Sequence, residues 1–341
     1  MGTIGIDTHK ASLAACRVDE LGSATAEATF DNDPAGHRLL LAWIQQADPA
    51  VIVGIEGSAS FGAAAARFLV ASGVTVREVP PQLTRRERAR TRRLGKSDPD
   101  DALAIARVTA RETDLPPVRL ADRTLDLQLL VEAREDVVIE MTRVRNRLHA
   151  HLRSLLPGYG VRAVNLVALR HQRLVGRLLR PLGGVQAELA RRQLVRLRAL
   201  GLEERSLTAR IAALVEDHPL LGLPGVGPLV TAKLVGEIGD IRRFRSADAL
   251  AALAGVAPIP ASSGQTQRLR LNRGGNRQLN RAFHMIALTQ AVHHPPAQAY
   301  LARKRAEGKT RREALRCLKR RLVRPVFGLL QAGAQPVSEA A

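Results

Sequence analysis

Cysteine is scarce in this sequence, which has only Cys16 and Cys317 among its 341 residues. The two lie far apart and outside any Cys-x-x-Cys or Cys/His ligand spacing, so the sequence supports neither a disulfide framework nor a structural zinc site. Long apolar runs are also missing, because none approaches the ~20 residues of a membrane span, and no signal-type segment opens the chain. The P-loop pattern is absent, as are the HxxxH and HExxH patterns of zinc enzymes. We therefore expect a soluble, cytoplasmic protein with both cysteines in its core.

Basic residues dominate the charge of the chain. It holds 52 Lys and Arg against 32 Asp and Glu, for a formal net charge of +20, and such an excess favours a polyanionic partner. Nucleic acid is the first candidate and a membrane surface is the second. The excess is uneven: residues 1–115 carry 14 basic and 15 acidic residues, whereas residues 116–341 carry 38 and 17. The N-terminal part therefore bears the acids, and the remainder bears the charge for binding a polyanion.

Hydrophobic periodicity divides the N-terminal part into strands and helices. Strands are predicted at residues 3–7, 12–18 and 26–30, followed by a helix at 34–46, a strand at 51–56, a helix at 60–72, a strand at 74–79 and a helix at 98–111. This order is that of an RNase H-like domain with a mixed sheet, although order alone fits other α/β folds.

The rest of the chain is predicted to be helical. Residues 121–156 and 185–215 form two long amphipathic patterns, which fit an antiparallel hairpin or a coiled-coil dimer equally well. After a Gly-rich turn near residue 225, helices continue to about residue 330, including one at 300–324 with eleven basic residues. We expect three domains: residues 1–115, a helical connector at 120–215 and an all-α C-terminal domain at 216–330.

Four acidic residues are candidates for a metal site. Asp7 and Glu56 end the first and fourth predicted strands, which are neighbours in an RNase H-like sheet, and Asp98 and Asp101 share one face of the following helix. Carboxylates of this kind bind Mg²⁺ or Mn²⁺, and two such ions can activate a nucleophile and stabilise the leaving oxygen of a phosphodiester. Taken singly, Asp98 is equally an N-cap and Asp7 a turn residue. Glu56, however, is costly at the end of an apolar strand unless it is paired or metal-bound.

Two C-terminal motifs suggest contact with a phosphate backbone. Residues 223–228 (LPGVGP) precede an apolar helix and are typical of a helix-hairpin-helix module, in which glycines and helix N–H groups approach a phosphate without reading sequence. Further on, Ser262 and Ser263 precede Gly264 and an arginine-rich stretch. A serine on such a loop can attack phosphorus while guanidinium groups stabilise the charge, although a Ser-Gly pair alone is far more often only a loop.

Basic and glycine residues near these motifs are the candidate nucleic-acid contacts. Residues 85–96 include seven basic residues and one acid directly before the last two candidate metal ligands. This segment is placed to hold a phosphate backbone against the metals, unless it is only a solvated loop. The candidates are Arg85, Arg86, Arg92, Arg93, Lys96, Gly225, Gly227, Lys233, Arg268, Arg270, Arg273 and Arg277.

Taken together, these motifs resemble a known family, the bacterial insertion-sequence transposases of the one-ten type, also called DEDD transposases. The N-terminal blocks are residues 5–10 (GIDTHK), 54–58 (GIEGS) and 96–102 (KSDPDDA). The C-terminal blocks are residues 223–227 (LPGVG), 238–240 (IGD) with Phe244, 253–258 (LAGVAP), 263–264 (SG) and 275–276 (GN). The blocks follow one another in order over nearly the whole chain.

The resemblance implies a RuvC-like domain whose four acids correspond to Asp7, Glu56, Asp98 and Asp101. It also implies a transposase domain with a serine nucleophile that maps to Ser263, because the family's serine precedes glycine; Ser262 is the alternative. A covalent phosphoserine intermediate, a dimer or tetramer, and an element-encoded non-coding RNA that specifies target and donor DNA are implied as well. One departure is visible: Ser97 and Asp100 stand where the family usually has threonine and a basic residue, and Asp100 adds negative charge beside the metals.

These observations predict a metal-dependent transposase or recombinase, which the resemblance places in the bacterial cytoplasm at the nucleoid. The first alternative is a Holliday-junction-type nuclease, which would use the acids and water without serine chemistry. The second is a non-catalytic DNA- or RNA-binding protein descended from such an enzyme.

Overall fold

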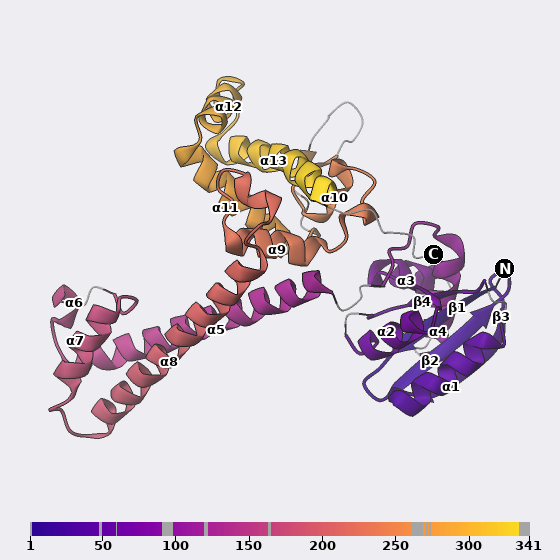
Figure 1. Cartoon of the computed structure of the whole chain (residues 1–341), viewed down its shortest axis with the longest axis horizontal. Coiled ribbons are helices and arrows are strands. Elements are labelled where there is room, and N and C mark those ends of the chain that lie inside the picture. Colours follow the sequence, from indigo (N-terminus) through magenta and orange to yellow (C-terminus); the bar gives the residue numbers. More distant parts are fainter. Residues whose placement is uncertain are drawn as a thin grey trace. The chain divides into compact units, whose positions relative to one another are not determined.

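The computed structural model of the chain describes residues 2–47, 50–58, 60–90, 98–118, 122–162, 165–260, 269–270, 272 and 274–333. The chain divides into two compact units, Met1–Ala121 and Asp122–Ala341, each described here by itself (Figure 1). The predicted connector and C-terminal domain fall within the second unit, and their division near residue 215 stays a prediction. Across the described residues, no helix is both long and apolar enough to cross a membrane.

A five-stranded mixed sheet forms the first unit, with strand order β3-β2-β1-β4-β5. β1 pairs antiparallel with β2 and β2 with β3, whereas β4 runs parallel to β1 and β5 parallel to β4. The fourth strand therefore lies beside the first, as the RNase H-like prediction requires. The strands are β1 (Thr3–Thr8), β2 (Ser12–Val18), β3 (Ala24–Asp31), β4 (Ile52–Ile55) and β5 (Thr75–Glu78).

Helices cover both faces of this sheet. Successive strand residues point to opposite faces, so Ile6 packs with Leu40 and Leu69 under α1 and α2. On the other face Cys16 packs with Ala106 of α4, which makes this cysteine a core residue as predicted. α3 occupies part of the basic segment, for which the sequence predicts no helix. The helices are α1 (Pro34–Gln45), α2 (Ala63–Ala71), α3 (Pro81–Arg90) and α4 (Asp98–Arg111).

The second unit begins with a long helical hairpin. α5 (Arg123–Leu155) starts after Asp122, whose carboxylate accepts hydrogen bonds from the N–H groups of Thr124 and Leu125, both at 2.9 Å, the usual N-cap arrangement. α8 (Val185–Leu214) packs along α5 in the same chain, so the two amphipathic patterns form a hairpin. α6 (Tyr159–Arg162) and α7 (Leu169–Leu179) lie at the far end of this hairpin (Figure 1).

A helical bundle follows, built around one apolar core that includes Phe283, Leu318 and Val323. The single helix predicted at residues 300–324 is wrong, because the chain turns at Gly308, whose φ of +83° favours glycine. The all-α prediction also misses a short antiparallel pair, β6 (Ile259–Pro260) with β7 (Leu269–Arg270). The helical elements are η1 (Pro219–Gly222), α9 (Pro228–Ile238), η2 (Ile241–Arg243), α10 (Ala247–Leu253), α11 (Arg277–His293), α12 (Pro295–Ala306) and α13 (Arg311–Gly333).

Candidate active site

Asp7 and Glu56 lie at the ends of neighbouring parallel strands. In the register of β1 and β4, Ile6 is opposite Ile55, and the N–H of Glu56 donates to the carbonyl oxygen of Ile6 at 3.2 Å. The two acids are therefore the next residues on adjacent strands. They share the edge of the sheet at which the sequence predicts a metal site.

Two glycines identify the face to which these acids belong. A Cβ on Gly5 would lie 2.2 Å from the backbone nitrogen of Ala106, and a Cβ on Gly54 would lie 1.8 Å from Oγ1 of Thr109. Both glycines therefore allow α4 to approach the sheet closely. Because strand residues two apart point to the same side, Asp7 and Glu56 belong to the face that α4 covers.

The direction of α4 brings its first turn to the same edge. Oγ1 of Thr3 donates to the carbonyl oxygen of Ala106 at 3.0 Å, whereas the Cβ position of Gly5, further along β1, also approaches Ala102, at 2.3 Å from its carbonyl oxygen. α4 thus runs antiparallel to β1, and its N-terminal turn lies toward the end of the strand. That turn carries Asp101.

Two of the predicted ligands bond to cationic or ionisable side chains of the first unit. Oδ2 of Asp7 lies 3.1 Å from Nε2 of His9, and its Oδ1 accepts from the N–H of Thr8 at 3.0 Å. Asp101 is only 7% exposed, and its Oδ1 accepts from Nη1 of Arg88, on α3, at 2.7 Å. The arginine offsets the cost of burying this carboxylate.

Asp98 is the first residue of α4, and its side chain lies outside the described residues. Among the side chains that are described, no group of three or more His, Cys, Asp or Glu residues is arranged to hold a metal ion. The donor chemistry of Asp7, Glu56 and Asp101 nevertheless suits Mg²⁺, which takes hard oxygen ligands.

Glu78 is a further carboxylate at this edge, and it was not among the site residues predicted from the sequence. It ends β5, and its Oε2 accepts from the N–H of Ser58 at 3.2 Å, so that it braces the turn directly after Glu56. Burial raises the pKa of Glu78 to about 7, and the charge of Glu56 adds to this rise, while backbone hydrogen bonds from Ser58 and Gly57 oppose it. The available signal was an acidic residue near the end of the strand predicted at residues 74–79.

The basic segment before α4 is divided by the structure. Arg85 and Arg86 are exposed on α3, where a phosphate can reach them. Arg88 from the same helix instead forms an ion pair with Asp101. At least one cation of the basic segment therefore neutralises a candidate metal ligand. Three further candidates fall outside the described residues: Arg92, Arg93 and Lys96.

Residues 223–227, predicted to belong to a helix-hairpin-helix module, form a turn between η1 and α9. Gly225 has a φ of +82°, and a Cβ there would lie 3.2 Å from the carbonyl oxygen of Ile286, so this glycine packs against α11. Gly227, the N-cap of α9, has open space around it and no side-chain cap bond. Lys233 is only 11% exposed, and its ammonium group pairs with Glu135 of α5. This contact favours a structural role for Lys233 over the expected contact with a phosphate.

The predicted serine nucleophile lies outside the described residues, as do Ser262, Arg268 and Arg273. The structure describes the chain on either side of residues 261–268, where Ile259 pairs with Arg270 in the β6–β7 ladder. Asn280 of α11 donates to the carbonyl oxygens of Ala254 and Gly255, both at 3.0 Å. The residues that lead into the segment with Ser263 are therefore attached to α11 of the helical bundle.

Further contacts extend this anchoring. Asn276 caps α11 and donates to Oε2 of Glu237 at 2.7 Å. Lys319 of α13 donates to Oδ1 of Asn280 at 2.5 Å. Arg270 and Arg277, at the two ends of this region, are both exposed and can contact a phosphate.

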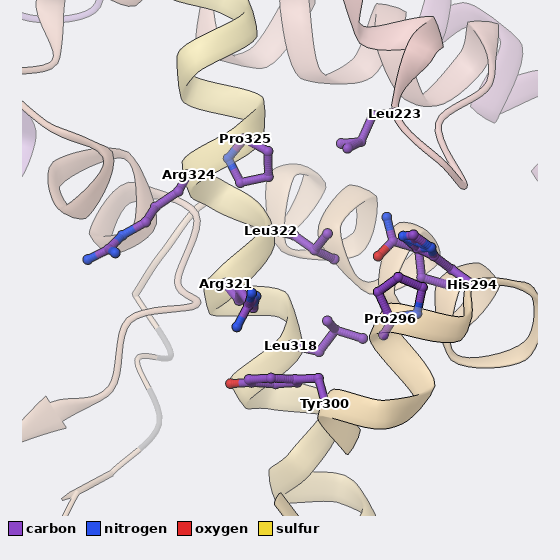
Figure 2. Close-up of a pocket in the computed structure, with 11 residues that line it drawn as sticks. Leu223, His294, Pro296, Tyr300, Leu318, Arg321, Leu322, Arg324 and Pro325 are labelled. Carbon is purple, nitrogen blue, oxygen red and sulfur yellow. The ribbon is translucent and has the colours of Figure 1, made fainter. Parts of the chain in front are cut away.

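A cavity of about 510 Å³ opens among α11, α12 and α13 (Figure 2). Leucine and proline side chains form much of its wall, and Arg321 and Arg324 lie on α13 beside it. The guanidinium carbon of Arg321 is 5.0 Å from the ring centroid of Tyr300, within the range of a cation–π contact. None of the predicted catalytic residues whose side chains are described lines this cavity.

Comparison with known proteins identifies the class of this chain. A transposase model of the DEDD IS110 type matches residues 4–157, and the model of the transposase IS116/IS110/IS902 family matches residues 217–302. The 43.6 kDa protein of insertion element IS110 from Streptomyces coelicolor is 28% identical, over 97% of this chain and 94% of that protein. The chain therefore belongs to the IS110 family of transposases.

Two further similarities accompany the family match. The pilin gene-inverting protein of Moraxella bovis is 26% identical over 96% of this chain and 95% of that protein. Among solved structures, T. thermophilus RuvC in complex with a Holliday junction substrate matches 34% of this chain and 99% of that chain, at 18% identity and a TM-score of 0.28.

Proposed function

We propose that this transposase cuts and rejoins DNA with Mg²⁺ or Mn²⁺ held by Asp7, Glu56, Asp98 and Asp101 and with Ser263 as the nucleophile. The observation that supports it most is the common edge at the ends of β1 and β4, with the first turn of α4 directed toward it. It supports a common site for carboxylates from three separate parts of the sequence.

When bound, the metal ions would supply Lewis-acid stabilisation of the phosphodiester and of the leaving oxygen. In the cleavage step the hydroxyl of Ser263 loses its proton and its Oγ forms a bond to phosphorus, while the bond from phosphorus to a deoxyribose oxygen breaks. The released oxygen takes up a proton. Attack by a hydroxyl group of another DNA end then reverses the exchange and frees the serine, so that strands are rejoined without an external energy source.

The position of basic residues supports contact with the DNA backbone. Arg85 and Arg86 are exposed in the first unit, and Arg270 and Arg277 are exposed in the residues that follow the segment with Ser263. In the sequence, one pair of these arginines therefore lies close to the proposed metal ligands and the other close to Ser263. Both pairs can bind phosphates. An element-encoded RNA that specifies the DNA partners, and a dimer or tetramer as the active form, complete the proposal as the family resemblance implies them.

A covalent protein–DNA adduct tests this function. Purified protein is incubated with Mg²⁺, RNA from the flanking element and end-labelled element DNA, and the products are separated on a denaturing gel. Wild-type protein should retain label, whereas the Ser263→Ala and Asp101→Asn variants should not. Ser262→Ala and Asp100→Asn are the matched controls, because each removes the same group from a neighbouring position, and both should form the adduct.

Other results point elsewhere. Cleavage without an adduct that persists in Ser263→Ala would contradict serine chemistry and favour the Holliday-junction-type nuclease. Binding that is indifferent to Asp7→Asn, with no cleavage in Mg²⁺ or Mn²⁺, would favour a non-catalytic binding protein. Cleavage that requires no RNA would remove the guide from the proposal and leave the chemistry intact.

A further inference from the structure

The far end of the α5–α8 hairpin has an unusual charge composition. Residues 141–187, here called the arginine tip, contain nine arginines and no aspartate or glutamate. They comprise the second half of α5, α6, α7 and the start of α8. No carboxylate of its own can therefore neutralise the tip.

The rest of the hairpin is different, because three of its arginines form ion pairs with glutamates of the hairpin. Arg134 of α5 pairs with Glu204 of α8, and Arg196 of α8 pairs with Glu140 of α5. Arginine side chains also stabilise the fold near the tip: Nη1 of Arg191 donates to the carbonyl oxygens of Leu179, the last residue of α7, and of Leu182, at 2.9 and 2.8 Å. These arginines, which stabilise the fold of the hairpin, all lie outside residues 141–187.

Seven arginines of the tip are exposed to solvent on packed helices. Val144, Leu148 and Leu152 of α5 and Val175 and Leu179 of α7 form a common apolar core. Exposed arginines surround it, and none of them forms an ion pair with a described carboxylate. They are Arg143, Arg147, Arg153, Arg170, Arg173, Arg177 and Arg180.

Four of these arginines form a row along α7. Arg170, Arg173, Arg177 and Arg180 follow one another at spacings of three and four, which places them on one face of the helix, opposite its buried residues. Ten residues at 1.5 Å each give the row a length of about 15 Å. One DNA strand carries a phosphate every ~3.4 Å of helix axis, so the row matches roughly four phosphates.

We propose that the arginine tip binds the phosphate backbone of duplex DNA that flanks the cut site. DNA is the partner because the family acts on DNA, and the proposal depends on the proposed function only in that respect. Between Glu135, which contacts α9, and Arg153, α5 covers about 27 Å, or roughly eight base pairs of DNA. The tip therefore lengthens the contact made by the helical bundle by most of one turn of the double helix.

The salt dependence of DNA binding tests this proposal. The full-length chain is mixed with a labelled DNA duplex of about 40 base pairs in a chelating buffer, so that no cleavage occurs, and its Kd is measured between about 50 and about 200 mM salt. Replacing the four arginines of the α7 row by glutamine removes up to four phosphate contacts. The slope of log Kd against log salt should fall by about 3 to 4, so the variant should lose about 100-fold less affinity than wild type across this range.

Two variants serve as controls. Exchanging the same four arginines for lysine keeps the charge and should keep most of the slope. Replacing four arginines of α8 (Arg192, Arg196, Arg205 and Arg210) by glutamine removes equal charge from the same unit, but two of these four have carboxylate partners. This variant should change the slope by less than about 1. Circular dichroism establishes that each variant is folded.

Several outcomes would overturn the proposal. They are an unchanged slope in the α7 glutamine variant, an equal loss in the α8 control, and a loss seen with duplex RNA but not with duplex DNA. Nuclease protection gives a second readout, in which wild type should protect about eight base pairs more than the α7 variant. Because no step requires cleavage, a failed adduct assay with a lowered slope would contradict the proposed chemistry and leave the DNA-binding tip intact.

Discussion

The close approach of α4 to β1 at Gly5 leads to a quantitative prediction. A Cβ at this position would lie 2.2 Å from the backbone nitrogen of Ala106 and 2.3 Å from the carbonyl oxygen of Ala102. Both are backbone atoms, so no side chain can move aside, and restoring ordinary contact requires α4 to shift by about 1 Å. Overpacking of this kind costs about 1–3 kcal/mol.

The Gly5→Ala variant should lose both stability and activity. Trp43 is the only tryptophan in the chain and lies in α1, so its fluorescence follows unfolding of the first unit. With a urea slope of about 2 kcal/mol per M, a loss of about 2 kcal/mol lowers the midpoint by about 1 M. The shift of α4 also displaces Asp101 from Asp7, and a misplacement of about 1 Å can lower the cleavage rate about 100-fold.

Gly183→Ala is the matched control, because nothing lies within 4 Å of a Cβ at that position. It should leave both the midpoint and the cleavage rate unchanged. A Gly5→Ala protein with wild-type midpoint and wild-type cleavage would refute the inferred packing of α4. Lower stability with normal cleavage would retain the packing but refute the link between this contact and the site.

Three further changes have defined outcomes. Arg88→Ala should lower the free energy of unfolding of the first unit by about 1 kcal/mol, a small value because the arginine is 35% exposed. In urea unfolding followed by Trp43 fluorescence, Mg²⁺ should restore part of this loss, because the ion takes the arginine's place at Asp101. For Glu78, the folded pKa of about 7 lies above the ordinary glutamate value of 4.5, so the folded state holds the proton to higher pH. The free energy of unfolding of wild type should therefore fall by roughly 3 kcal/mol as pH rises from 4.5 to above 7. Glu78→Gln should remove this pH dependence, and a pH series of urea midpoints will establish or disprove it. Lys233→Ala should destabilise the second unit by about 1–2 kcal/mol, since it removes one charged partner of the Glu135 carboxylate, which keeps Gln278 and Arg281 as partners. Thermal unfolding should show this loss, whereas a weaker salt dependence of DNA binding would support the predicted phosphate contact.

Local patterns in the sequence were sufficient for most of the fold. Alternation predicts the strands of the first unit, and apolar spacing predicts α5 and α8 within about two residues of their ends. The failures have physical causes. α3 lacks an apolar stripe that would mark it as a helix, and the turn at Gly308 interrupts a run of charged residues whose pattern is the same on both sides.

For the candidate site, the sequence predicted only those features that follow from the order of the strands in the sheet. Placing Asp7 beside Glu56 follows once the first and fourth strands are taken as neighbours. The partners of the charged groups do not follow, because they come from distant sequence: Lys233 and Glu135 are 98 residues apart. A lysine on an amphipathic helix has the same signature in sequence whether it binds phosphate or a buried carboxylate.

The identity of the residue that becomes linked to DNA tests the central claim most directly. Trypsin should release residues 246–268 (SADALAALAGVAPIPASSGQTQR) as one peptide from protein that has reacted with element DNA and then been treated with nuclease. Fragmentation in a mass spectrometer then distinguishes the hydroxyl groups of this peptide. We expect a nucleotide phosphate on Ser263 that requires Mg²⁺ and is absent from Asp101→Asn. A nucleotide on a different residue, or cleaved DNA with no modified peptide, would contradict it.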